Sequence, residues 1–143
     1  MKAFRILFAL VLLLPLRALN AQIEERALMS VNIPFAFIVD NTPLPAGRYV
    51  IYSELGHEWK VVSIHGKGSA FFHITPDETP ALPAQSRLIF HRYETEYVLH
   101  QIDDGGTKIQ AMLSTGNKER QLARKAPQPE LAMIDAQPGA HGK

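Results

Sequence analysis

The chain has 143 residues, of which 15 are basic, 14 are acidic and none is cysteine. That length suits one domain with a hydrophobic core, and the scattered, nearly balanced charge excludes a basic footprint for nucleic acid or for an anionic membrane surface. Without cysteine the chain has no disulfide, no thiol nucleophile and no cysteine-ligated metal.

The N-terminus has the pattern of a secretory signal peptide. Two basic residues and the apolar run 6–16 precede Ala21, a small residue that suits signal-peptidase cleavage. The run is shorter than the ~20 apolar residues that span a membrane. We expect residues 1–21 to be removed; cleavage after Ala18 and an uncleaved anchor are the weaker alternatives. Residues 1–21 carry three basic residues and no acidic one, so the mature chain has 12 basic and 14 acidic residues and a net charge of −2.

Apolar side chains alternate along residues 31–39, which predicts a β-strand with one buried face. Pro34 cannot donate a ladder hydrogen bond, so we expect this strand at a sheet edge or beside a bulge. The proline-rich turn that follows ends at Gly47, where we expect a positive φ or a close backbone approach. The alternating side chains are Val31, Ile33, Phe35, Phe37 and Val39.

Six further strand-like segments are separated by turn residues, which is typical of an antiparallel barrel or sandwich. They span residues 48–55, 59–65, 69–75, 86–93, 96–102 and 107–113. Residues 117–125 have helical propensity, with Asn117 as a candidate N-cap, and the Pro/Gly-punctuated residues 126–143 are predicted to be disordered.

The predicted fold is therefore all-β: a single antiparallel barrel or sandwich of about seven short strands, with a short C-terminal helix and a disordered tail. The predicted organisation is a signal peptide (1–21), an N-terminal lead-in (22–29), a β domain with its C-terminal helix (30–125) and a disordered tail (126–143).

Several short motifs resemble a family of small exported β-rich proteins of unknown function that is abundant in Acidobacteria. The pattern combines a VxVPFxF-like strand, an LPAGxY-like corner, an FxxY hairpin and a late Glu-Arg helix start. Ala36 and the pair Asp103-Asp104 depart from it. The resemblance implies export and a β-rich fold and carries no activity. The matching residues are Val31, Pro34, Phe35, Phe37, Leu44, Pro45, Ala46, Gly47, Tyr49, Phe90, Tyr93, Tyr97, Leu99, Glu119 and Arg120.

Among the histidines, His91 and His100 are the sharpest pair. A two-residue turn at 94–95 would place His91 opposite Val98 and His100 diagonally across from His91, within roughly 7–8 Å. Two imidazoles at that spacing could share a metal ion, but a metal site needs a third ligand. The interpretation we favour is a pair of half-exposed strand histidines, with no metal and no cofactor.

The remaining polar residues do not fall in a recognisable catalytic motif. There is no G-x-S-x-G elbow, and Asp103 and Asp104 beside two glycines predict a turn. Trp59, Tyr49 and Tyr52 form only a weak candidate for an aromatic surface that binds sugar or peptide, because the two tyrosines have opposite parity. The other aromatic side chains are predicted to fill the core: Phe35, Phe37, Phe72, Phe90 and Tyr97.

We therefore expect an exported, non-catalytic β domain, periplasmic or secreted, that acts as a binding or structural module of the cell envelope or exterior. Its partner would be an unidentified protein or envelope component, bound by strand addition at a sheet edge. A carrier of a small apolar or sugar ligand is the alternative, and a pocket would favour it. A hydrolase or metal-binding protein built on His91 and His100 is the third hypothesis, and a third polar ligand beside the two rings would favour it.

The signal-peptide hypothesis predicts that the exported protein begins at Gln22, because cleavage follows the small residue Ala21. Intact-mass analysis of protein recovered from the periplasm or medium of an expressing bacterium measures this directly. Exported protein that still begins at Met1 would contradict the hypothesis.

Overall fold

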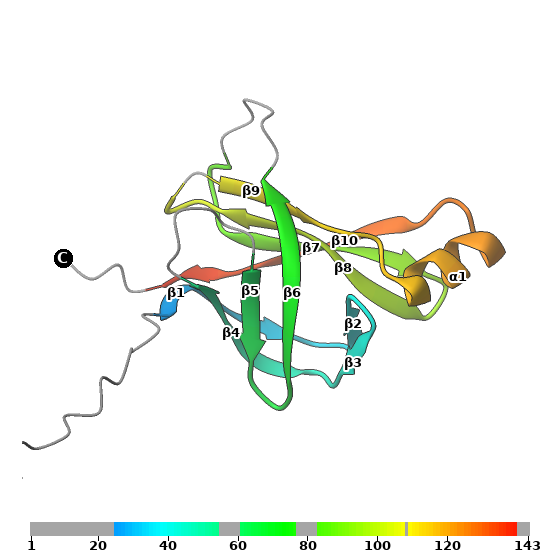
Figure 1. The fold of residues 1–143 in the computed structure, drawn as a ribbon, viewed down its shortest axis with the longest axis horizontal. Helices are drawn as coiled ribbons and strands as arrows, with labels where there is room; N and C mark the ends of the chain where they lie inside the picture. Colours follow the sequence, from blue (N-terminus) through cyan, green and yellow to red (C-terminus); the bar gives the residue numbers. More distant parts are fainter. Residues whose placement is uncertain (1–24, 55–60, 77–82, 108, 140–143) are drawn as a thin grey trace, which may run out of the picture.

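β-Strands dominate the computed structural model of the chain (Figure 1), which describes residues 25–54, 61–76, 83–107 and 109–139. Within these ranges there are eleven strands and one helix, so the predicted all-β fold with a short helix is confirmed. The elements are β1 (Glu25–Ile33), β2 (Phe37–Val39), β3 (Thr42–Leu44), β4 (Gly47–Glu54), β5 (Val61–His65), β6 (Ser69–Pro76), β7 (Arg87–Tyr93), β8 (Glu96–Asp104), β9 (Ile109–Leu113), α1 (Asn117–Lys125), β10 (Glu130–Asp135) and β11 (Gln137–Pro138).

The predicted strand 31–39 is broken into β1 and β2 at Pro34. Proline lacks the N–H that a central strand donates, and here it ends β1 instead of lying within a ladder. Part of the predicted lead-in, 22–29, also belongs to β1, which starts at Glu25 and pairs with β4 along its length. The other six predicted strands correspond to β4 through β9.

The strands form one mixed sheet in the order β10-β7-β8-β9-β6-β5-β4-β1-β11. Its two end strands, β10 and β11, are separated in the chain by Ala136 alone, so one segment pairs with β7 and then with β1. The prediction of a disordered tail over 126–143 is therefore wrong for residues 130–138. Pro and Gly in that segment mark the ends of short strands rather than disorder, and the sheet is a bent, unclosed one rather than a closed barrel.

The short strands β2 and β3 lie off this main path. β2 pairs with β3 in an antiparallel ladder and with the first part of β8 in a parallel one, at Phe37↔Tyr97 and Ile38↔Val98. β9 pairs with the later part of β8, from Gln101 onward. The sequence predicted only antiparallel pairs, because a parallel partner is set by contacts distant in the chain.

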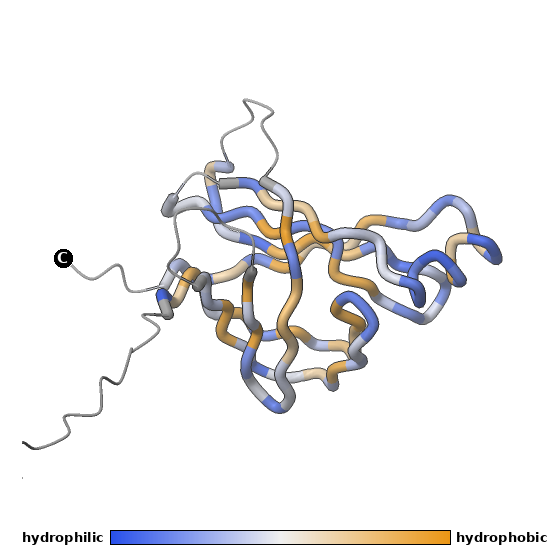
Figure 2. Tube along the Cα trace, in the orientation of Figure 1, coloured by the Kyte–Doolittle hydropathy of each residue, from blue (hydrophilic) through white to orange (hydrophobic). Residues whose placement is uncertain are grey.

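The main core lies inside the bend of the sheet, where the hydrophobic stretches of the strands gather, while turns and much of α1 are hydrophilic (Figure 2). Phe37, Phe72 and Phe90 are buried as predicted. Phe37 packs edge-to-face against Phe90 and Tyr49, with ring centroids 5.6 and 5.2 Å apart. Phe35 and Tyr97 are partly buried at the border of this core.

The proline-rich corner is closed by Tyr49, whose hydroxyl donates a 2.7 Å hydrogen bond to the carbonyl oxygen of Pro45. Tyr49 is fully buried, so the proposed aromatic surface of Tyr49, Tyr52 and Trp59 does not include it; Trp59 lies outside the described residues. Burial raises the pKa of the Tyr49 hydroxyl. Gly47 does not have a positive φ, and a Cβ there would meet only the flexible Lys67 side chain, at 3.1 Å. The prediction of a special backbone at Gly47 is wrong.

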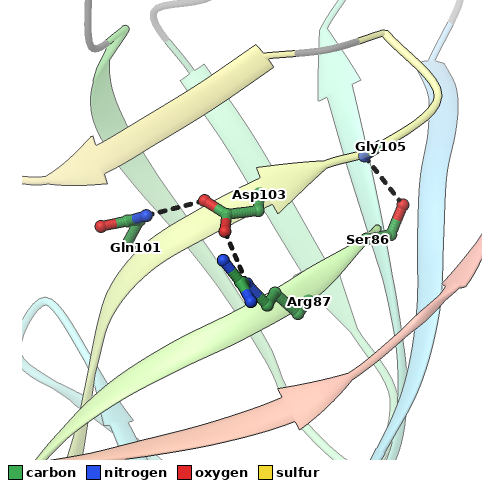
Figure 3. A network of polar contacts seen from close by, with 5 residues as sticks. All are labelled: Ser86, Arg87, Gln101, Asp103 and Gly105. Atoms are coloured by element: carbon green, nitrogen blue, oxygen red, sulfur yellow. Dashed lines mark hydrogen bonds and ion pairs between the residues drawn. The ribbon is translucent and has the colours of Figure 1, made fainter. Parts of the chain in front are cut away.

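Asp103 and Asp104 do not form an exposed turn: they end β8 and are buried. Asp103 accepts hydrogen bonds from Arg87 Nε at 2.8 Å and Gln101 Nε2 at 2.7 Å. Figure 3 shows these bonds beside the bond from the Gly105 backbone N–H to Ser86 Oγ. The carboxylates thus join the ends of β7, β8 and the turn to β9.

The position of Phe37 predicts a large stability loss on truncation. Phe37 is 2% exposed, so Phe37→Ala leaves a cavity and lowers the free energy of unfolding by about 3–5 kcal/mol. Phe71→Ala is the matched control: Phe71 is 60% exposed, and its loss should cost no more than about 0.5 kcal/mol. Chemical denaturation measures both, and similar midpoints for the two variants would contradict this assignment of the core.

Candidate functional site

α1 packs near the turn of the β7–β8 hairpin, on the side of these strands away from the main core. A second, smaller hydrophobic cluster joins them, because the apolar side of the helix packs onto that face. The cluster contains Ile38, Tyr93 and Val98 from the sheet and Leu122, Ala123 and Ala126 from the helix.

The start of α1 is held by the turn between β2 and β3. The backbone N–H of Lys118 donates to Asn41 Oδ1 at 3.1 Å. Gly116 is the N-cap and has no side-chain cap, so the predicted capping role of Asn117 is wrong. A Cβ on Gly116 would lie 2.4 Å from the carbonyl oxygen of Asp40, and only glycine allows the helix to begin so close to that backbone.

This docking buries Glu119, a first-turn residue that is 4% exposed. Its Oε1 atom lies 2.6 Å from His91 Nδ1 and accepts a 3.1 Å hydrogen bond from the Tyr93 hydroxyl. Because an ionised carboxylate only accepts hydrogen bonds, Nδ1 of His91 carries the proton. Two donors from one strand thus compensate the burial of a negative charge.

His91 and His100 are neighbours, as predicted. The two-residue turn gives the predicted pairing of His91 with Val98, but a β-bulge follows it: Ile89 pairs with Gln101 and Phe90 with Leu99, which leaves His100 as the extra residue. The bulge brings the two imidazoles into a stack, with centroids 3.7 Å apart and planes 20° apart.

The surroundings shift three pKa values. Burial raises the pKa of Tyr93 to about 12, and the nearby Glu119 carboxylate adds to the shift. Burial lowers the pKa of His100, and the charge of His91 lowers it further. Burial alone would raise the pKa of Glu119, but hydrogen bonds from His91 and Tyr93 and the charges of the two histidines outweigh it and lower that pKa.

Two imidazoles and one carboxylate therefore meet in this histidine–glutamate cluster, defined by His91, His100, Glu119 and the adjoining Tyr93. One ligand atom from each of the first three lies within 4.8 Å of the others. From the sequence, Glu119 was recognised only as part of the Glu-Arg motif and was not predicted as a ligand. The helix start was predictable, but nothing local indicates that it folds back onto the β7–β8 hairpin.

A pocket of about 450 Å³ opens beside β2 and β3, next to the first turn of α1. Its walls are mainly apolar, and Glu96 and Lys118 carry the charges, with Lys118 Nζ 3.7 Å from Glu96 Oε2. The apolar wall residues include Phe37, Ile38, Leu44 and Tyr97.

Two further histidines among the described residues lie outside the cluster. His65 lies on β5 with its ring 5.9 Å from that of Phe71, and His73 is exposed on β6. His57 lies outside the described residues. A comparison with known protein families, with curated proteins and with solved structures finds no match to the chain.

The lowered pKa of Glu119 predicts a pH-dependent contribution to stability. The folded pKa lies below the unfolded one, so the contribution is complete above the unfolded value of about 4.3 and is lost as the pH falls through the folded pKa. Glu119→Gln should therefore cost about 1–2 kcal/mol at pH 7 and progressively less below pH ~4.

Denaturation curves of wild type and Glu119→Gln at several pH values, with a chelator present, measure this difference. Glu94→Gln, at the exposed hairpin turn, is the control and should leave the curves unchanged. A cost of Glu119→Gln that stays constant from pH 7 to pH 3 would contradict the assignment.

Proposed function

We propose that this protein is an exported, non-catalytic binding module of the cell envelope or exterior, and that it binds a small, mainly apolar molecule. The observation that carries the proposal is the pocket beside β2 and β3. Its volume of about 450 Å³ lies within the range of ~300–1,000 Å³ that is usual for small-ligand sites.

The pocket walls suit a ligand with an apolar body and a polar end. Phe37, Leu44 and Tyr97 offer aromatic and aliphatic surface, and Tyr97 is held rigid by a stacked contact with Phe35, with centroids 3.8 Å apart. The Lys118 ammonium at the rim, 3.7 Å from Glu96 Oε2, supplies a positive charge that suits an anionic group at the polar end of the ligand.

A small ligand is better supported than a protein partner bound by strand addition. Two of the strands at the borders of the sheet contain proline, Pro43 in β3 and Pro138 in β11, whereas the end strand β10 contains none. Proline blocks ladder hydrogen bonds and is a common guard against edge-to-edge pairing. A binding role also fits the polar residues better than hydrolysis does, because Asp103 and Asp104 are buried and engaged by neighbouring donors.

Export is supported by the N-terminal pattern of the sequence and by the resemblance to small exported proteins. Across residues 25–54, 61–76, 83–107 and 109–139, no helix has the length and apolar character needed to cross a membrane. The scattered charge of the mature chain supports a partner other than nucleic acid.

A pocket-filling variant tests the proposal. The probe is 1-anilinonaphthalene-8-sulfonate, an apolar anion that fluoresces when it leaves water. Ala36 lines the pocket, and we expect Ala36→Trp to weaken probe binding at least about tenfold by occupying apolar surface. Phe71→Ser, which removes an exposed aromatic outside the pocket, should leave binding unchanged. Equal affinity of wild type and Ala36→Trp, with intact circular dichroism, would reject the pocket as the site.

A further inference from the structure

The histidine–glutamate cluster brings together three metal-ligating side chains from three separate elements. His91 comes from β7, His100 from the bulge of β8 and Glu119 from the first turn of α1. Their ligand atoms lie within 4.8 Å of one another, and the side chains of His91 and Glu119 are only 18% and 5% exposed.

The ligand types select a class of ion. Imidazole nitrogen suits zinc, copper and nickel, and two histidines with one glutamate form a known three-ligand set that leaves a fourth position for water. We propose that His91, His100 and Glu119 bind one divalent transition-metal ion of this class, with Zn²⁺ as the physiological example. This site is separate from the pocket and goes beyond the proposed ligand-binding function.

The present distances are close to those that coordination requires. Tetrahedral ligands about 2.0–2.1 Å from zinc lie roughly 3.3 Å from one another. His91 Nδ1 and Glu119 Oε1 are 2.6 Å apart with a proton between them, so an ion replaces that proton, which leaves to solvent, and the pair opens by less than 1 Å. His100 leaves its stack by rotation about χ2, a soft torsion for imidazole.

Tyr93 supplies the orientation that such a site needs. Its hydroxyl donates to the Glu119 carboxylate at 3.1 Å. Metal-ligating carboxylates are commonly held by an outer hydrogen bond of this kind, and loss of the outer partner typically weakens metal binding by about 10–100-fold.

A substitution at His100 distinguishes a metal-binding role of the cluster from a purely structural one. A clamp that fixes α1 to the sheet is complete with the two bonds from His91 and Tyr93 to Glu119. His100 takes no part in those two bonds, and its ring stacks on that of His91. His100→Gln therefore removes a metal ligand and leaves the clamp in place.

The test is titration of purified protein with ZnCl₂ by isothermal calorimetry, supported by the visible spectrum of added Co²⁺. We expect one equivalent to bind, with affinity at least about tenfold weaker in His91→Gln, His100→Gln and Glu119→Gln. His73→Gln is the matched control, because His73 is exposed and outside the cluster, and its affinity should equal that of wild type.

Circular dichroism and thermal melts establish that each variant is folded. If Glu119→Gln or His91→Gln unfolds, His100→Gln still decides the question. The proposal is overturned if Zn²⁺ does not bind, or if folded His100→Gln binds it as wild type does. Since Ala36→Trp affects only the pocket, a failure of the ligand-binding proposal leaves this result unchanged.

Discussion

The pairing of segment 130–138 with both ends of the sheet is the constraint on which the remaining arrangement depends. β10 pairs with β7 at six positions, and β11 pairs with β1 after a single intervening residue. The backbone N–H of Gly139 then donates to the carbonyl oxygen of Leu28 at 2.7 Å. In a chain without cysteine, these backbone hydrogen bonds take the place of a covalent link between segments distant in sequence.

This pairing also fixes α1. The helix lies between two anchors: its first turn is bound to Asn41, and only the four residues 126–129 separate its end from β10. Because the helix is fixed at both ends, Glu119 is buried even though burial of its negative charge is unfavourable. Burial of an ion costs several kcal/mol unless partners compensate it, and His91 and Tyr93 supply that compensation. Their hydrogen bonds and the charges of the two histidines lower the pKa of Glu119 even though burial alone would raise it.

Much of the fold was predictable because it is encoded locally. The alternation of apolar and polar residues, together with the turn residues, predicted the strands β4 to β9. The two-residue turn after Tyr93 likewise predicted that His91 pairs with Val98. The bulge at His100 was not predictable, because an extra residue leaves no mark on the local pattern. The strands of the C-terminal segment were missed because their order comes from partners that are distant in the chain.

The third ligand of the candidate site illustrates the same limit. Glu119 lies 28 residues from His91 in sequence, and its burial follows from the way α1 is anchored and packed against the sheet. A glutamate in the first turn of a helix is ordinarily explained by the helix dipole and an exposed position. Only the packing of Leu122 and Ala123 against the sheet turns that face inward.

Among the residues that the structure describes, Asp103 and Asp104 form one set of buried carboxylates and Glu119 is another, and their hydrogen-bond partners differ in chemistry. Asp104 accepts from Ser86 Oγ, Thr107 Oγ1 and the Gly106 backbone N–H. Those donors do not titrate near neutral pH and are poor transition-metal ligands, so this network is suited to a structural role in holding strand ends together. Glu119 is instead held by an imidazole and a phenol, with a second imidazole stacked on the first. Amide or hydroxyl donors would be sufficient to fix α1 to the sheet. The imidazoles beside Glu119 can in addition ligate a metal ion, which the proposed site requires.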